Sequence, residues 1–129
     1  MKTGDFAGRL LLIDFWAPGC APCLRSLPAL ADLHTRLNPE GLEVIAVAVE
    51  GDEARVRGFL ENDRGVPFPV ALDPDGGLME RVALSDVPSW IVLDAFGRLV
   101  HRSEGADPRR VEWVVRRGLE QLRMRTKVR

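Results

Sequence analysis

Apolar runs alternate with stretches of helical periodicity along this chain. Residues 10–15 and 44–49 are apolar at nearly every position, which is typical of parallel strands buried on both faces. Residues 89–93 form a third apolar run, and the turn at 95–98 predicts a hairpin to the strand that follows. The strands expected from these runs are 10–15, 44–49, 68–72 (short), 89–93 and 99–101.

Helical patterns fill the intervals between the strands. Apolar residues recur every three or four positions from Cys20 to Leu37, and Pro28 inside this pattern should kink the helix. Its expected inward face is Leu24, Leu27, Leu30, Ala31, His34 and Leu37. Asp52 is expected to cap a second helix that ends near Asp63, and a brief helix is expected over 78–82. Asp107 should cap a last helix, and residues 123–129 are expected to fray.

This order of elements, β-α-β-α-β-β-α, predicts an α/β fold. The first strands should be parallel with right-handed crossovers, and the later hairpin should add an antiparallel edge. We therefore expect a mixed central sheet with helices on both faces. The 129 residues are enough for one domain with its own core, and we treat 1–129 as a single domain.

Charge and hydropathy limit the partners. The net charge of −1 gives no reason to expect a nucleic-acid partner. The basic residues after 115 are typical of a solvated helix face. No apolar run approaches the roughly 20 residues that span a bilayer. No secretory leader precedes the first strand, so the sequence leaves cytoplasmic and extracytoplasmic compartments open.

The chain has two cysteines, Cys20 and Cys23, placed between a buried strand and a helix. At this spacing the two sulfurs can close a small ring. The first cysteine meets the unpaired N–H groups and the positive dipole end of the helix, which stabilise a thiolate and lower its pKa below about 8.5. Cys20 is the candidate nucleophile, and Cys23, one turn deeper, is the candidate resolving thiol. The Cys20–Cys23 disulfide would itself be the redox group, with no separate cofactor.

Other uses of the pair are weaker. A zinc site would need His34 and His101, which are single and distant, so no metal is expected. A structural disulfide would close too short a loop to constrain the unfolded chain much. Two unrelated buried cysteines would not explain why Trp16, Pro18 and Pro22 frame the pair.

Two segments resemble the signatures of the thioredoxin-like superfamily. Residues 13–23 are similar to its strand and redox helix, and residues 87–100 are similar to its cis-proline and hairpin. The residues after Cys23 and the insert at 68–73 resemble the bacterial TlpA-type and ResA-type thiol-disulfide oxidoreductases. The resemblance implies a thioredoxin-like fold with a TlpA-type insert. It also implies a monomer that reduces disulfides of client proteins and receives its electrons from an upstream donor. It also favours a periplasmic or other extracytoplasmic location.

The resemblance assigns roles around the cysteines. Asp14 resembles the buried acid of classical thioredoxins, where burial would raise its pKa and let it accept the proton of Cys23. Trp16 should pack beside the motif, and Pro22 should restrain the helix start. A cis bond before Pro88 would turn the Val87 backbone toward an extended client. The site-shaping residues expected in all are Trp16, Pro18, Ala21, Pro22, Val87 and Pro88.

Three features depart from the relatives. Ser26 stands where many carry glutamate, and Asp14 stands where many carry asparagine; both argue against a cytochrome client. Only a short segment precedes the first strand, so the N-terminal hairpin of the relatives is expected to be largely absent.

Three other functions use similar folds. A peroxidase of the peroxiredoxin type would need threonine or serine at position 17, which is Ala17. A copper chaperone would space the cysteines one residue further apart and add a histidine near Val87. A redox-sensing interaction domain would use the same exchange chemistry and stays open.

Overall fold

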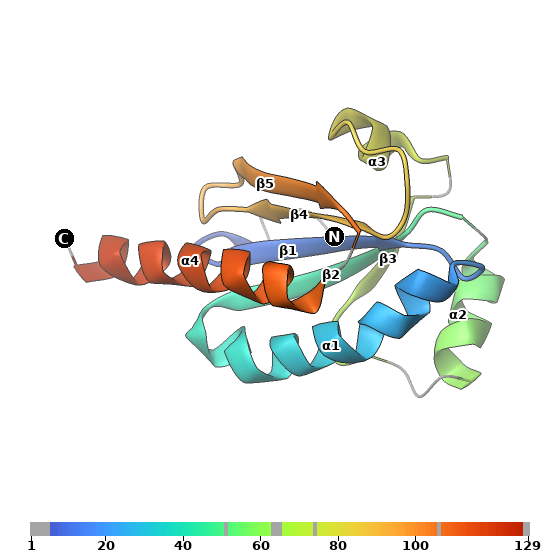
Figure 1. The fold of residues 1–129 in the computed structure, drawn as a ribbon, viewed down its shortest axis with the longest axis horizontal. Coiled ribbons are helices and arrows are strands. Elements are labelled where there is room, and N and C mark those ends of the chain that lie inside the picture. Colours follow the sequence, from blue (N-terminus) through green and yellow to red (C-terminus); the bar gives the residue numbers. More distant parts are fainter. Residues whose placement is uncertain (1–5, 51, 63–65, 74, 106, 128–129) are drawn as a thin grey trace.

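The computed structural model describes residues 6–50, 52–62, 66–73, 75–105 and 107–127. Five strands form one sheet in the order β3-β2-β1-β4-β5 (Figure 1). Strand β1 is parallel to β2, which is parallel to β3, whereas β4 is antiparallel to both β1 and β5. This mixed sheet confirms the predicted α/β fold. The strands are Leu10–Trp16 (β1), Leu42–Ala48 (β2), Val70–Leu72 (β3), Ser89–Leu93 (β4) and Leu99–Glu104 (β5).

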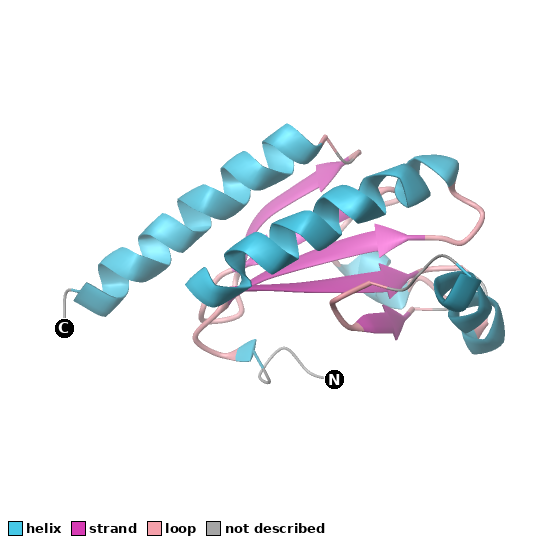
Figure 2. Ribbon diagram, turned by 90° about the horizontal axis from the view of Figure 1, so that it is seen from below, coloured by secondary structure: helices cyan, strands magenta, loops and turns pink. Residues whose placement is uncertain are grey.

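Helices cover both faces of the sheet. Helices α1 and α4 lie on one face, where Figure 2 shows them in front of the strands, and α3 lies on the other face. The helices are Ala21–Leu37 (α1), Asn38–Glu40 (η2, a 3-10 turn), Glu53–Asn62 (α2), Gly77–Arg81 (α3) and Pro108–Lys127 (α4). Within the described ranges, no helix has the length and apolarity needed to cross a bilayer.

Strand β1 is the centre of the core because all seven of its residues are buried. Alternate side chains point to opposite faces of a strand. Leu12 and Trp16 pack with the α1 and α4 layer, whereas Ile13 and Phe15 pack with the α3 layer. Asp14 has the same parity as Leu12 and Trp16, so its carboxyl points toward α1 and α4.

The caps and the Pro28 position follow the sequence prediction. The Asp52 carboxylate accepts from the Arg55 N–H at 2.8 Å, and the Asp107 carboxylate accepts from the Arg109 N–H at 3.0 Å. Pro28 lies inside α1 without ending it. Asp63, near which the second helix is predicted to end, lies outside the described residues.

Three details differ from the prediction. Leu33 and Ser26 are buried on α1, whereas Leu24, Ala31 and His34 are only half-buried. Strand β5 continues to Glu104 because it keeps pairing with β4. The segment 123–129, which is expected to fray, is helical as far as Lys127, where α4 ends. Two contacts lie near this end of the helix: Arg123 pairs with Glu40 at 3.4 Å, and the Arg125 guanidinium stacks 4.4 Å from the Phe96 ring centroid. Residues 128–129 lie outside the described range.

Gly41 makes the turn into β2 in a conformation that other residues resist. Its φ is 115°, and a Cβ there would lie 2.8 Å from a methyl carbon of Leu122 on α4. We expect Gly41→Ala to lower the free energy of unfolding by about 1–2 kcal/mol, because both the backbone and the packing must shift.

Urea unfolding of the oxidised protein measures this effect. Gly58→Ala is the matched control, because Gly58 lies within α2 and a Cβ there would meet no atom within 4 Å. Alanine at position 58 should stabilise the protein by up to about 1 kcal/mol. Equal unfolding midpoints for both variants would contradict the prediction.

Candidate active site

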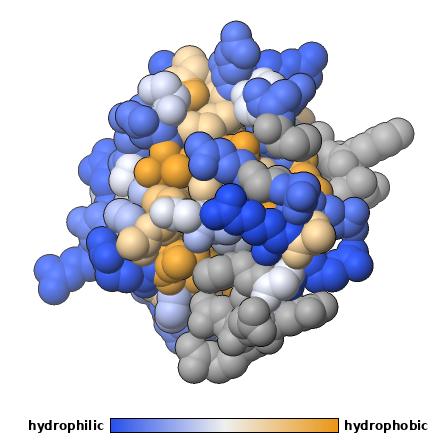
Figure 3. Space-filling model, turned by 90° about the vertical axis from the view of Figure 1, so that its right-hand side faces the viewer, coloured by the Kyte–Doolittle hydropathy of each residue, from blue (hydrophilic) through white to orange (hydrophobic). Residues whose placement is uncertain are grey.

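The cysteine pair lies at the end of the sheet where β1 leaves it and α1 begins (Figure 1). Figure 3 views this end of the molecule, where apolar side chains come to the surface among hydrophilic ones. Of the framing residues, Pro18 is half-buried, and Ala21 and Pro22 are exposed. This is a surface on which a protein partner can reach the loop.

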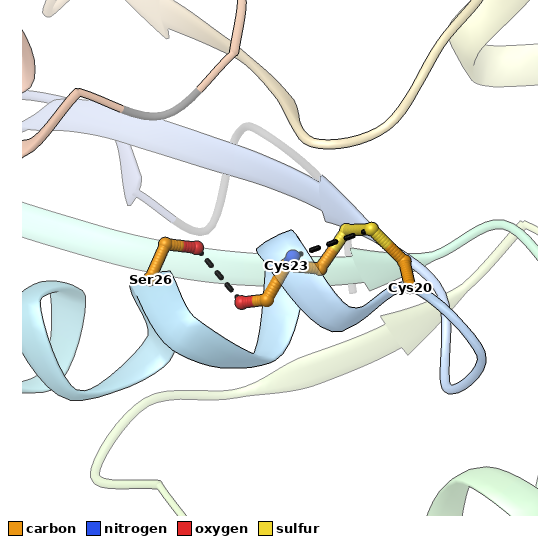
Figure 4. The surroundings of a disulfide bond; sticks show 3 residues. All are labelled: Cys20, Cys23 and Ser26. Atoms are coloured by element: carbon orange, nitrogen blue, oxygen red, sulfur yellow. Dashed lines mark hydrogen bonds between the residues drawn. A yellow bond between two sulfur atoms is a disulfide. The ribbon is translucent and has the colours of Figure 1, made fainter.

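Cys20 and Cys23 form a disulfide, with their Cα atoms 5.3 Å apart (Figure 4). Cys20 is the N-cap of α1, with extended backbone (φ −98°, ψ 100°), and its Sγ accepts from the Cys23 N–H at 3.2 Å. The sequence prediction of a sulfur at a helix N-terminus is therefore confirmed. The same N–H would stabilise a Cys20 thiolate in the reduced protein.

The two sulfurs differ in access. Cys23 is fully buried in the core cluster beneath α1, whereas Cys20 is half-buried at its edge. Burial raises the pKa of a thiol, and the helix terminus lowers it. The geometry thus provides one reachable sulfur and one protected sulfur within bonding distance of it.

Ser26 lies one turn beyond Cys23, and its hydroxyl is buried. Its Oγ donates to the Cys23 carbonyl oxygen at 2.8 Å (Figure 4). The hydroxyl proton is therefore used by the helix backbone, and the side chain brings no acid to the sulfurs. The sequence analysis did not place Ser26 on the inward face; its spacing of three residues from Cys23 is the signal that could have found it.

Asp14 is buried beneath the same helix. Its side chain is 1% exposed, and its Oδ2 has no hydrogen-bond partner among the described residues. Burial raises the pKa of this carboxyl to about 8. The predicted burial and pKa shift are both present, and the pKa of this carboxyl is therefore close to that of a thiol.

Trp16 is fully buried in the cluster that contains Cys23. Its carbonyl oxygen accepts from the Val49 N–H at 2.9 Å, which ties the end of β1 to the loop after β2. Trp16 and Cys23 therefore belong to the same part of the core.

The Val87–Pro88 peptide bond is cis, as the resemblance implied. Both residues are half-buried, and the Pro88 carbonyl oxygen accepts from the Gly105 N–H at 2.8 Å. Val87 and Cys20 each pack against the core cluster beneath α1. Val87 also lines an open groove of about 590 Å³, whose acidic wall is formed by Glu50, Asp75, Glu80 and Asp86.

Arg55 approaches the loop before Cys20 from α2. A Cβ on Gly19 would lie 3.7 Å from its Nη2. A cation at this place adds to the positive potential at the start of α1. Sequence reasoning missed Arg55 because this proximity joins residues that are distant along the chain and depends on how α2 packs.

The two histidines, His34 and His101, lie beside aromatic rings. Among the described residues, no group of three or more histidine, cysteine or acidic side chains could hold a metal ion. The rings of His34 and Phe68 meet edge-on, with centroids 5.9 Å apart, and His101 stacks on Trp90 at 4.7 Å. His101 is half-buried, and its burial, together with the charge of Arg110, lowers its pKa.

A Cys-x-x-Cys disulfide at the start of the first helix, beside a cis-proline loop on this sheet, defines the class of thioredoxin-like dithiol proteins. The chain belongs to the Redoxin family, whose model matches residues 1–118. It is 28% identical over 100 residues to the thiol-disulfide oxidoreductase ResA of Bacillus subtilis, a match that covers 78% of this chain and 55% of that protein. The ResA of Bacillus thuringiensis is 26% identical over 105 residues, with 81% and 60% covered.

Solved structures share this fold. A putative thiol:disulfide interchange protein DsbE from Chlorobium tepidum superposes with a TM-score of 0.80 at 25% identity, covering 95% of this chain and 85% of that one. The exposed lipoprotein thioredoxin Etrx1 of Streptococcus pneumoniae has a TM-score of 0.79 at 24% identity, with 88% of each chain covered, and shows the shared fold. These similarities confirm the TlpA/ResA-type resemblance. The chain spans about 55–60% of the length of these ResA relatives.

Proposed function

We propose that this protein is a thiol-disulfide oxidoreductase that reduces disulfides of client proteins. The observation that carries the proposal is the pairing of a reachable sulfur, Cys20, with a buried sulfur, Cys23, at the N-terminus of α1. The ResA relatives are named for the same chemistry, which supports the proposal. The groove beside Val87 would receive an extended client segment.

The reaction starts from the reduced protein. The Cys20 thiolate attacks one sulfur of the client disulfide, so a Cys20–client bond forms and the other client sulfur leaves as a thiol after taking up a proton. Cys23 then loses its proton and attacks Cys20, which closes the Cys20–Cys23 disulfide and releases the second client sulfur as a thiolate that takes up a proton from water. Two electrons pass from the protein to the client, and an upstream dithiol donor must restore them.

Asp14 is the proposed base for the second step. The Cys23 thiol is buried, so its proton must go to a group within the protein. The carboxylate of Asp14 takes that proton, and a pKa of about 8 matches the acceptor to a thiol donor. Trp16, Pro18, Ala21, Pro22, Val87 and Pro88 shape the surface around this exchange.

The resemblance supports further parts of the proposal. It favours a location outside the cytoplasm and a monomer that acts on bacterial client proteins. A redox-sensing domain would perform the same exchange with a signalling client, so identifying the client decides between these roles.

A thiol count tests the activity. The protein is reduced with dithiothreitol, desalted and mixed with insulin, and we expect two insulin thiols to appear for each Cys20–Cys23 pair oxidised. Hydrogen peroxide in place of insulin should oxidise the pair no faster than it oxidises a free thiol. Rapid oxidation by peroxide with no reaction toward insulin would favour a peroxidase and overturn the proposal.

A further inference from the structure

A narrow cleft between α1 and α4 leads to the buried carboxyl of Asp14. Its volume is about 120 Å³, and Asp14 of β1 and Trp90 of β4 form its floor. The described residues that line it include neither cysteine. Its walls are Ser26, Ala29, Leu30 and Leu33 on α1 and Pro108 and Val111 on α4. Asp14 therefore faces a cleft whose described lining is separate from the dithiol.

Charged side chains surround the outer end of this cleft. Arg36 of α1 donates to Glu112 of α4 at 2.7 Å and to Asp32 at 2.8 Å, and Arg116 donates to Glu112 at 2.9 Å. The Arg36 side chain is 41% exposed, so this network is hydrated. Water can therefore enter the cleft between the two helices.

Polar atoms continue inward from this mouth. The Asp14 Oδ2 is buried without a hydrogen-bond partner among the described residues, which costs about 1–3 kcal/mol unless water reaches it. Ser26 lines the same cleft, and its hydroxyl oxygen can still accept a hydrogen bond while its proton is donated to the Cys23 carbonyl. A roomy cavity with polar partners holds water, and an apolar one stays dry.

We propose that this cleft is the route by which Asp14 exchanges its proton with bulk water, between α1 and α4 and not past the sulfurs. The inference deepens the proposed function and rests on it for its purpose. Asp14 takes the proton of Cys23 while a client is still bonded to Cys20 and covers that surface. A separate outlet lets the Asp14 carboxyl pass the proton to water and return to its ionised form during that time.

The test narrows the cleft and follows the carboxyl directly. After a laser-induced pH jump near pH 8, infrared detection follows the relaxation of the C=O band of the Asp14 carboxyl. The band is assigned to Asp14 by its absence in Asp14→Asn. Ala29→Leu should slow this relaxation by at least about tenfold. Thr35→Leu, an exposed position of α1 outside the lining, should leave the rate unchanged.

The measurement uses the disulfide form, so its outcome is independent of the exchange activity. A relaxation in Ala29→Leu within about twofold of the wild-type rate would overturn the proposal. The proposal would also be overturned if Ala21→Leu, at the exposed helix start beside the sulfurs, slowed the relaxation and Ala29→Leu did not. If the leucine variant does not fold, Ala29→Val is measured in the same way and against the same criteria.

Discussion

Replacing Cys23 with serine will stop the exchange at the covalent intermediate and leave the client bonded to Cys20. Cys20 remains half-exposed at the N-cap of α1, so its attack on a client disulfide is unchanged. The internal thiol that displaces the client is gone. The lifetime of the mixed disulfide should then extend to minutes or hours, the range of uncatalysed disulfide rearrangement.

Mass spectrometry of the non-reduced adduct measures this result with a disulfide-bonded peptide or a cell lysate. Cys20→Ser is the matched control, because its remaining thiol, Cys23, is fully buried and should form no adduct. An adduct that forms as readily on Cys23 of this control would show that the two sulfurs have been assigned the wrong roles. The same trap identifies the client when the lysate comes from the native organism.

Replacing Asp14 with asparagine should separate the two steps of the reaction. Capture of the client by Cys20 needs no proton from Cys23 and should keep its rate. Release should slow by about 100-fold, the smaller end of what a positioned general base contributes. Stopped-flow mixing of reduced protein with a peptide disulfide resolves both steps, and unchanged release would remove Asp14 from the proton transfer.

The same substitution should change how stability depends on pH. The pKa of Asp14 is about 8 in the folded protein against 3.8 for the ordinary carboxyl, so between these values the folded state binds a proton that the unfolded state has lost. The wild type therefore loses stability as pH rises through this window, by up to about 5 kcal/mol, and Asp14→Asn does not. Below pH 3.8 both states bind the proton, and the pH-dependent difference vanishes.

Urea unfolding of the two oxidised proteins between pH 4 and pH 8 measures the difference. We expect the curve of the wild type to fall relative to that of the variant, with most of the change complete near pH 8. Parallel curves would mean that Asp14 keeps an ordinary pKa in solution.

Local patterns along the chain were sufficient for most elements of the fold. Ser89–Leu93 matches its predicted bounds because an apolar run limited by polar turns leaves little choice of pairing. Asp52 and Asp107 cap their helices because a carboxylate satisfies free N–H groups within its own turn. The last turns of α4 contact Glu40 and Phe96, which are distant in sequence, so no local pattern indicates these contacts.

The sequence by itself determined the order of strands and helices and the chemistry of the Cys20–Cys23 pair, because both depend on spacing within a few residues. Only the tertiary structure decided what surrounds that chemistry. A strand buried on both faces does not reveal which layer Asp14 meets, and the packing of α1 and α4 settled it. The cleft and the Arg36–Glu112 pair also depend on the tertiary structure, because each is formed by side chains from two separate helices. Those side chains meet only after the helices pack on the sheet.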